Sequence, residues 1–419
     1  MPPTVRAARL AHGRAFIYAC SMQQNRLPLP LVVITFANMT LLGFLNSMRG
    51  VSFPLIRNSF NASYNHMGLM NALTLISMVC FCLASGYYMN RFGLKKNIIT
   101  GFLFILLGAA SLYFSSGFWI ALGLYLILQA GFGFFEIGLN GMGVRIFTVK
   151  TGLMMNLLHF SYGVGAIIGP RFMGYAVNHG FRWQEVYPMA LVPALVLLAV
   201  SLALRFPARP ESTKAVEVPS FWRLLNDPMV WLFGIIIGLG SAIEGCSVAW
   251  SGLYLFDVYG LEPSTAGAVF VSAFYAVFTV SRLFSGFVIE KIGYLKSVHI
   301  ASFAIFVIFA LAFSLGRNGI YLLPLIGFFV AIIWPTVLSI SAGVFKERAQ
   351  TASSAIICIA FALNGTIQYM IGLINRFIGA SWGYRSCLLY SAVLIILLFR
   401  LWHKSIGAEK IIPQSNEAR

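Results

Sequence analysis

Twelve long apolar runs, most of them close to twenty residues or longer, decide what this chain can fold into. The hydrocarbon core of a bilayer is about 30 Å thick, so a helix that crosses it needs about 20 predominantly apolar residues. A spanning segment must also satisfy its own backbone hydrogen bonds, because lipid offers none. We therefore expect an all-α membrane protein with twelve transmembrane helices, near residues 28–54, 67–89, 97–115, 118–143, 153–178, 186–206, 229–256, 264–289, 297–315, 319–345, 350–375 and 383–403.

A polar, proline-containing segment follows the sixth run and divides the runs six and six. It carries charges of both signs, which is typical of a linker and not of a span. The sequence thus predicts an N-terminal tail at 1–27, a first six-helix bundle at 28–206, a cytoplasmic linker at 207–228, a second six-helix bundle at 229–403 and a C-terminal tail at 404–419.

The composition excludes several other classes of protein. Of the 419 residues, 59% are hydrophobic and only 10% are charged, whereas a soluble domain has about 25% charged residues. An ordinary soluble enzyme, a disordered chain and a secreted disulfide scaffold are therefore excluded. The six cysteines lack metal-ligand spacing, and the phosphate-binding pattern Gly-x4-Gly-Lys-[Ser/Thr] is absent. We expect no metal, no cofactor and no ATP-driven pump.

The net charge of +17 is distributed in short segments between the apolar runs. This distribution argues against a nucleic-acid partner, whereas basic loops are typical of the cytoplasmic face of a membrane protein. The N-terminal tail is basic, the C-terminal tail has one more basic than acidic residue, and the linker contributes three further basic residues. The loops from even to odd helices are basic too, at Arg91, Lys95, Lys96, Arg145, Lys150, Lys291, Lys296, Lys346 and Arg348. Both termini are expected in the cytoplasm, in a multi-pass protein of the cell membrane, which is the inner membrane if the source is bacterial.

An internal repeat relates the two halves at an offset of 200 residues. Both copies have the spacing Gly-x3-[Asn/Glu]-[Arg/Lys]-x-Gly, and they run from Gly86 to Gly93 and from Gly286 to Gly293. Each copy lies between the second and third helix of its half. Two parallel six-helix halves are the architecture of a transporter with a central site. A plain basic loop with turn glycines is the alternative interpretation.

This loop resembles the signature loop of the major facilitator superfamily, in which acidic and basic side chains form a charge cluster that latches the cytoplasmic side. The resemblance implies the fold of that superfamily, with two pseudo-symmetric six-helix bundles. The chain has Asn90 where an Asp is usual, and it keeps an acid at Glu290. The implied cytoplasmic gate consists of Gly86, Asn90, Arg91, Gly93, Arg282, Gly286, Glu290, Lys291 and Gly293.

Ionisable side chains within a span are functional candidates, because burying a charge in lipid is expensive. Only two acids lie within the predicted spans, Glu136 in the fourth and Glu244 in the seventh. Removal from water favours the neutral form of a carboxyl group, so Glu136 is suited to exchange a proton. Asn140 lies one turn further on the same helix face. The alternatives are a structural pair of Glu136 with Arg49 or a hydrogen bond between helices, and a cap by Glu244 on an unwound stretch.

Segments across nearly the whole chain also resemble the fucose–galactose–glucose/H+ symporter branch of the superfamily. They include Asn38 to Pro54, Glu136-x3-Asn140, Asn156-Leu-Leu-His159, Gly163 to Pro170, Glu244 to Tyr254, Phe278-Thr279-x2-Arg282 and Ile333 to Thr336. The resemblance implies that Glu136 is a protonatable coupling carboxylate. The chain has Gly50, next to Arg49, where that branch has an Asp. Arg49 can either hold Glu136 ionised or meet an anionic solute, and the sequence leaves both open.

Polar and aromatic side chains within the spans are the candidate substrate contacts. His159 follows Asn156 by three residues, so both can face one cavity, although a lone membrane histidine is often a packing residue. Trp250 and Tyr254 share a helix face and suit stacking on a sugar ring, but anchoring at the membrane interface is the alternative. Two amides on the eleventh helix suit hydroxylated solutes or join helices. The predicted proton-coupling residues are Glu136 and Glu244, and the predicted substrate-binding residues are Asn46, Arg49, Asn140, Asn156, His159, Trp250, Tyr254, Asn364 and Gln368.

Together these features predict a secondary active transporter that moves a sugar or another small polar solute by alternating access and proton symport. An exporter or antiporter of a small organic molecule is the alternative, because Gly165-x3-Gly169-Pro170-x3-Gly174 partly resembles an antiporter signature, with Met173 in place of one glycine. We expect no enzyme activity. The expected partners are a small solute, H+ and the lipid bilayer, and the expected oligomeric state is a monomer.

Overall fold

The computed structural model describes residues 29–148, 150–207 and 221–406. The predicted N-terminal tail, the central part of the predicted linker and the tail from residue 407 onward lie outside these residues. The described residues are almost entirely helical and contain no strand. They include twelve helical segments that are long and apolar enough to cross a membrane. The predicted all-α fold with twelve transmembrane helices is thereby confirmed.

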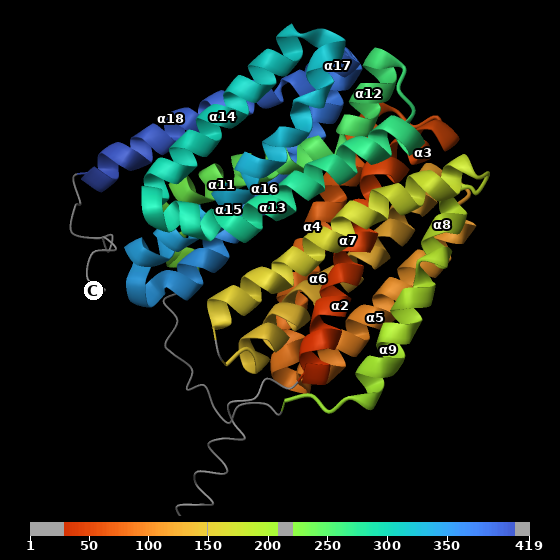
Figure 1. Ribbon diagram of the computed structural model, residues 1–419, viewed down its shortest axis with the longest axis horizontal. Helices are drawn as coiled ribbons and strands as arrows, with labels where there is room; N and C mark the ends of the chain where they lie inside the picture. Colours follow the sequence, from red (N-terminus) through yellow and green to blue (C-terminus); the bar gives the residue numbers. More distant parts are fainter. Residues whose placement is uncertain (1–28, 149, 208–220, 407–419) are drawn as a thin grey trace, which may run out of the picture.

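The first half of the chain forms the first six spans (Figure 1). Two of these spans consist of two helices each, and a short 3₁₀ turn, labelled η, ends a third. The elements are α2 (Leu29–Ser47), α3 (Arg49–Ser59), α4 (Tyr64–Phe92), α5 (Leu94–Ser111), η1 (Leu112–Phe114), α6 (Phe118–Ile146), α7 (Thr151–Asn178), α8 (Trp183–Met189) and α9 (Leu191–Ala203).

The second half repeats this arrangement beside the first (Figure 1). The elements are α10 (Phe221–Leu224), α11 (Pro228–Ala249), α12 (Ser251–Tyr259), η2 (Pro263–Gly267), α13 (Ala268–Ile292), α14 (Tyr294–Ser314), η3 (Gly316–Tyr321), η4 (Leu323–Leu325), α15 (Ile326–Phe345), η5 (Lys346–Arg348), α16 (Ala349–Phe377), α17 (Ala380–Arg385) and α18 (Cys387–Ile406).

Local sequence signals fix where several helices begin and end. Ser63 caps α4, because its hydroxyl accepts a hydrogen bond from the backbone N–H of His66, whose ring in turn accepts from the backbone N–H of Ser63. Asp227 caps α11 by accepting from the N–H of Met229 at 2.8 Å. Gly93 ends α4 with a φ of +90°, a conformation that glycine adopts without steric cost.

The backbone itself reveals the duplication of the two halves. Eight of the nine described residues with positive φ form four pairs, separated by 199, 200, 196 and 199 residues: Asn61 with Gly260, Gly93 with Gly293, Lys150 with Lys346, and Gly180 with Gly379. A left-handed backbone conformation is rare outside tight turns, so four matched pairs mark equivalent turns. The repeat found in one loop of the sequence therefore extends to four inter-helix connections of each half.

Most helices extend further than the predicted apolar runs. The prediction that Glu136 and Glu244 are the only acids within spans is wrong, because Glu185, Glu290 and Glu347 lie inside helical segments as well. These three residues occupy end turns, where a helix leaves the hydrocarbon region and charged side chains can reach water. Among the acids that the structure describes, Glu136 lies well inside α6, and Glu244 lies near the middle of the seventh span, which α11 and α12 form together.

The first and seventh spans are each broken in the region where the two halves meet. α3 follows α2 after Met48, and α12 follows α11 after Trp250. Pro54 in α3 has no N–H, so the carbonyl oxygen of Gly50 lacks its helical partner. A Cβ placed on Gly252 would lie 2.9 Å from that oxygen and 2.8 Å from Cγ of Pro54. The two broken helices thus approach each other closely because both contact positions are glycine.

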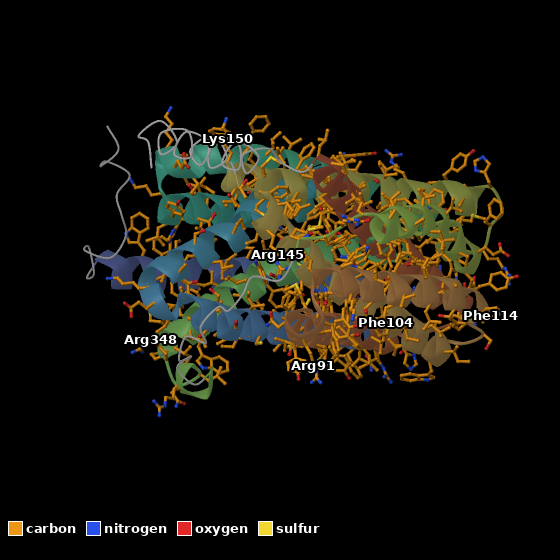
Figure 2. All side chains as sticks on the ribbon, turned by 90° about the horizontal axis from the view of Figure 1, so that it is seen from below. Arg91, Phe104, Phe114, Arg145, Lys150 and Arg348 are labelled. Carbon is orange, nitrogen blue, oxygen red and sulfur yellow. The ribbon has the colours of Figure 1, made fainter. Side chains whose placement is uncertain are left out.

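The spans alternate in direction, so the loops form two ends of the molecule. We call the end that carries Arg91, Lys150, Lys291 and Arg348 the basic end, and the opposite end the distal end. Figure 2 shows Lys150 and Arg348 toward one end and Phe114 at the other. The short helices α3, α8, α12 and α17 gather at the distal end (Figure 1).

Candidate functional site

Glu136 lies in the middle of α6, which is packed closely against its neighbours. A Cβ on Gly133 would lie 2.9 Å from the backbone of α4, and a Cβ on Gly131 would lie 2.7 Å from the backbone nitrogen of Ile105 in α5. The two glycines thus allow both neighbouring helices to approach α6 closely. The side-chain amide of Asn140 donates to the carboxylate of Glu136 at 3.1 Å, which confirms that both residues share one face. The carboxyl group also interacts electrostatically with Arg282 of the other half.

Glu244 lies in α11, six residues before the break at Trp250. The helix is continuous through Glu244, so the alternative in which this carboxyl group caps an unwound stretch is wrong. Its electrostatic partners are Arg282 of its own half and Arg49 of the first half. Glu244 therefore faces the same region as Glu136 from the opposite side.

Arg49 is the first residue of α3 and lies directly after the break in the first span. Its guanidinium group interacts electrostatically with Glu244 and with three tyrosines, which are Tyr125, Tyr162 and Tyr275. Arg49 makes no ion pair with Glu136, since the ion pairs with an N–O distance within 4.0 Å among the described residues are Arg57–Asp257 and Arg182–Glu185. The structural pair of Arg49 with Glu136 is therefore not formed.

Arg282 lies in α13, one turn before Gly286 of the predicted gate loop. Its guanidinium group lies 4.6 Å from the centre of the Phe278 ring and interacts electrostatically with Glu136, Glu244 and His159. We call Arg49, Glu136, Glu244 and Arg282 the central charged cluster. Each half contributes one arginine and one glutamate to it.

Amide and hydroxyl groups border the cluster in both halves. In the second half, the indole N–H of Trp250 donates to Oε1 of Gln368 at 2.8 Å, and Nε2 of Gln368 donates to Oδ1 of Asn364 at 3.1 Å. In the first half, Nδ2 of Asn46 donates to the hydroxyl of Tyr162 at 2.9 Å. The structure thus brings together a polar chain on each side of the cluster.

The other predicted substrate-binding residues do not have the neighbours that the sequence predicted. Tyr254 stacks on Tyr384, with ring centres 4.6 Å apart, and does not share a partner with Trp250. Both Trp250 and Tyr254 are buried, so neither is an anchor at the membrane interface. His159 interacts with Arg282, whereas Asn156 is exposed.

The two predicted gate loops are free at the basic end. Asn90, Arg91, Glu290 and Lys291 are exposed, and no hydrogen bond or ion pair joins any of these four side chains to another described residue. A Cβ placed on any of the four loop glycines would meet no atom within 4 Å. The charge cluster that the resemblance implies is therefore not assembled in this conformation.

At the distal end, in contrast, hydrogen bonds and an ion pair connect the two halves. Arg57 donates to both carboxylate oxygens of Asp257, at 3.1 and 3.2 Å, and the hydroxyl of Tyr64 donates to the same carboxylate at 2.5 Å. Asn178 and Ser264 form a second link, with the Ser264 hydroxyl donating at 2.7 Å. Sequence reasoning missed these contacts. Their one signal was that Arg57 and Asp257 lie 200 residues apart, at equivalent positions of the repeat.

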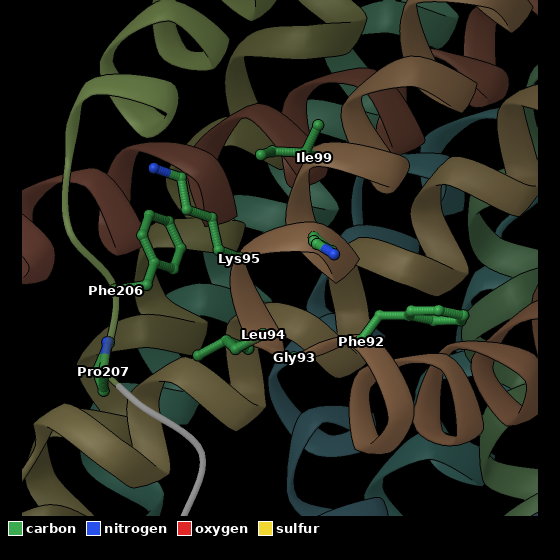
Figure 3. A pocket seen from close by; sticks show the side chains of 8 residues that line it. Phe92, Gly93, Leu94, Lys95, Ile99, Phe206 and Pro207 are labelled. Atoms are coloured by element: carbon green, nitrogen blue, oxygen red, sulfur yellow. The ribbon is translucent and has the colours of Figure 1, made fainter.

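Lys95, which lies in the first turn of α5 just after the first gate loop, has a separate structural role. Nζ of Lys95 donates to the carbonyl oxygens of Leu202 and Leu204, at 2.7 and 2.8 Å, and so caps the C-terminal end of α9. Figure 3 shows Lys95 beside Phe206 in the pocket that the loop forms with the residues after α9. The second loop has Leu295 at the equivalent place and lacks this cap.

The arrangement is that of two duplicated six-helix bundles with charged groups at their centre. A family model described as "Major Facilitator Superfamily" matches residues 35–368. The chain belongs to the major facilitator superfamily. The predicted superfamily is confirmed, and the chain is a multi-pass membrane transporter and not an enzyme. Among its described residues, no group of three or more His, Cys, Asp or Glu side chains is placed to hold a metal.

Relatives of this superfamily member carry names that refer to different solutes. The L-fucose-proton symporter of Escherichia coli is 23% identical over 388 residues, which cover 82% of this chain and 87% of that protein. The cis,cis-muconate transport protein of Acinetobacter baylyi is 22% identical over 299 residues, covering 67% and 71%. The crystal structure of the nucleoside transporter NupG matches with a TM-score of 0.72 at 13% identity, covering 90% of this chain and 99% of that one. This structural likeness shows the shared fold alone.

Proposed function

We propose that this transporter moves a small polar solute together with a proton, and that Glu136 carries the proton. The position of Glu136 is the observation that carries the proposal. Its carboxyl group lies in mid-span, is held by Asn140 of its own helix, and interacts with Arg282 of the other half without a direct ion pair. The similarity to an L-fucose-proton symporter supports this coupling.

A proton on Glu136 changes the attraction between the two halves. Ionised Glu136 attracts Arg282, and protonation removes that attraction because the carboxyl group becomes neutral. A group whose charge acts across a moving interface biases the equilibrium between conformations. Glu244 interacts with the same arginine from the second half, so it is the second coupling carboxylate of the proposal. Arg282 then interacts mainly with Glu244 when Glu136 is protonated, and with both carboxylates when Glu136 is ionised.

The solute site of the proposal lies between the two polar chains that border the cluster. Asn46, Tyr162 and Asn140 face it from the first half, and Trp250, Gln368 and Asn364 from the second. Amide and hydroxyl groups of this kind recognise hydroxylated solutes by hydrogen bonds. His159 contributes through Arg282, and exposed Asn156 meets the solute on its way to the site.

Alternating access requires the two ends to open in turn. In this structure the distal end is joined by Arg57 and Asp257, and the gate loops of the basic end are free. With the basic end in the cytoplasm, as its lysines and arginines favour, this conformation opens inward. The signature loops then latch the basic end in the outward-open conformation. We propose both termini in the cytoplasm, an inner-membrane location in a bacterium, and function as a monomer.

Reconstituted liposomes with an internal pH indicator test this function directly. Addition of a transported sugar or other small polar solute outside should acidify the interior, and Glu136→Gln should abolish the acidification. Glu262→Gln is the matched control, because Glu262 is exposed and lies outside the central charged cluster.

Two results would contradict the proposal. Solute uptake with unchanged proton entry in Glu136→Gln would show that another group carries the proton. Proton exit during inward solute movement would show an antiporter, which is the second function that this fold supports. Glycines of the fifth span do not favour that function, since Gly165 and Gly169 serve the close packing of α7 against α2.

A further inference from the structure

Two arginines at the centre of the transporter, Arg49 and Arg282, have no side-chain hydrogen bond or ion pair to a described residue, although Arg282 packs over the ring of Phe278. Nε of Arg49 and Nε of Arg282 are both buried without a hydrogen bond, and neither side chain takes part in an ion pair among the residues that the structure describes. Both residues nevertheless keep part of their surface accessible, although protein surrounds them on several sides. Neither side chain is therefore completely enclosed by protein.

An unpaired guanidinium group is costly in such a place. Arginine stays protonated in proteins, so it cannot lose its charge to avoid the cost. Charged groups within membrane spans are accordingly found with partners or facing water-filled cavities. The carboxylates of the cluster interact with the arginines only at distances beyond a direct ion pair. Glu244 interacts electrostatically with both arginines, and neither arginine is ion-paired among the described residues. An anion that enters beside Glu244 can therefore approach a guanidinium group without displacing an ion-paired partner.

The charges of the cluster also balance with an anionic solute. With both carboxyl groups ionised, two arginines face two glutamates, and the sum is zero. A proton on Glu136 leaves one excess positive charge. The other titratable side chains that interact electrostatically with the cluster carry no permanent charge, and they are Cys82, Tyr125, His159, Tyr162, Tyr187 and Tyr275. A solute with one carboxylate restores neutrality in the protonated, loaded transporter.

We propose that the solute is a hydroxylated organic anion, and that Arg49 and Arg282 bind its carboxylate. This inference rests on the proposed proton symport and names its substrate class. Arginine binds carboxylate through two parallel N–H···O bonds, which a neutral sugar cannot accept in the same geometry. The amides of Asn46, Asn140 and Gln368 then remain for the hydroxyl groups. Arg49 does not form an ion pair with Glu136, so its guanidinium group is available for the carboxylate of the solute.

Matched pairs of acids and neutral sugars test the substrate class in liposomes with a clamped membrane potential. The pairs are D-glucuronate with D-glucose and D-galacturonate with D-galactose. The acids should drive proton entry about tenfold faster or more, since a lost hydrogen bond to a charged group costs about one to two factors of ten in affinity. Cotransport of one proton with one monoanion moves no net charge, so an imposed potential should not change the rate.

Variants of Arg49 separate recognition from folding. Arg49→Gln should lower acid uptake about 10- to 100-fold at a fixed low concentration, whereas Arg49→Lys keeps the charge and should retain more of the uptake. Arg385→Gln is the matched control, because Nε of Arg385 is also buried without a partner but packs against Trp382 and Phe313, away from the cluster. It should transport at the wild-type rate.

The outcomes distinguish the two proposals. Proton entry driven by neutral sugars as fast as by the acids, or unchanged acid uptake in Arg49→Gln, overturns the anion inference and leaves proton symport standing. A response to neither class overturns both. Acid-driven proton entry that is independent of potential and depends on Arg49 supports both.

Discussion

Arg282 of α13 and Glu136 of α6 interact electrostatically across the boundary between the two halves, yet they form no direct ion pair. A tight, desolvated ion pair would hold the halves together strongly, because separating it exposes two uncompensated charges. The looser interaction can instead be switched by one proton or by an entering solute. This relationship connects the chemistry of the carboxyl group to the movement of the halves.

Removal of the Arg282 charge should therefore uncouple the transporter. We expect Arg282→Gln to lower solute-driven proton entry about 10- to 100-fold, which is the loss associated with the proposed hydrogen bond from Arg282 to the carboxylate of the solute. Arg282→Lys should lose less, because it keeps the positive charge. Internal pH in liposomes measures both variants. The control is Arg317→Gln, because Arg317 is exposed and lies in the short 3₁₀ helix η3 at the distal end. Equal loss in the Gln and Lys variants would argue against an electrostatic role.

The link between Arg57 and Asp257 should hold the distal end closed. Asp257→Asn removes the charge that Arg57 and Tyr64 both bind, so opening of this end should become about tenfold easier. Hydrogen–deuterium exchange of the backbone amides in α3 and α12 measures the opening, which should accelerate. The control is Glu185→Gln, since Glu185 pairs with Arg182 within one half. The same acceleration in the control would show a general loss of stability.

Gly50 should tolerate no side chain in this conformation. A Cβ at this position would lie 2.8 Å from Cγ2 of Val271 and 3.0 Å from the carbonyl oxygen of Val248, both in the other half. Overpacking of this kind costs about 1–3 kcal/mol, so Gly50→Ala should lower the apparent melting temperature in detergent. Gly123→Ala, where no atom lies within 4 Å of the new Cβ, should leave it unchanged or higher. Unchanged stability of Gly50→Ala would show that the halves meet less closely than described.

Lys95 and Lys96, which follow the first gate loop, should contribute differently to the stability of the protein. Lys95→Met removes the donor to two carbonyl oxygens at the end of α9, which should cost about 1 kcal/mol. Lys96 is exposed and makes no hydrogen bond to a described residue, so Lys96→Met should leave the melting temperature nearly unchanged. Thermal unfolding of the two variants in the same detergent measures the difference. An equal decrease for both would contradict the capping role.

The sequence predicts relations within a helix far better than relations between helices. Asn140 was expected on the face of Glu136 because the residues are four apart, and the hydrogen bond confirms it. The adjacency of Asn364 and Gln368 is confirmed in the same way. Helical periodicity fixes such neighbours before any tertiary structure forms. It also predicts the twelve spans, because a bilayer demands a minimum apolar length.

Contacts between the halves depend on which helices pack together, and periodicity does not contain that information. The hydrogen bond from Trp250 to Gln368 joins residues 118 positions apart. Trp250 therefore contacts another helix and does not form the expected aromatic surface with Tyr254. The link between Arg57 and Asp257 was missed, since each residue alone resembles an ordinary charge near a helix end. Only the repeat offset of 200 residues related the two positions before the structure was known.

Solute exchange compared with accumulation tests the central role of Glu136 most directly. Counterflow of labelled solute between liposomes loaded with unlabelled solute and the medium needs no net proton movement, whereas uphill accumulation driven by a pH gradient does. We predict that Glu136→Gln retains counterflow and loses accumulation. Accumulation against a gradient by Glu136→Gln at the wild-type level would contradict the account.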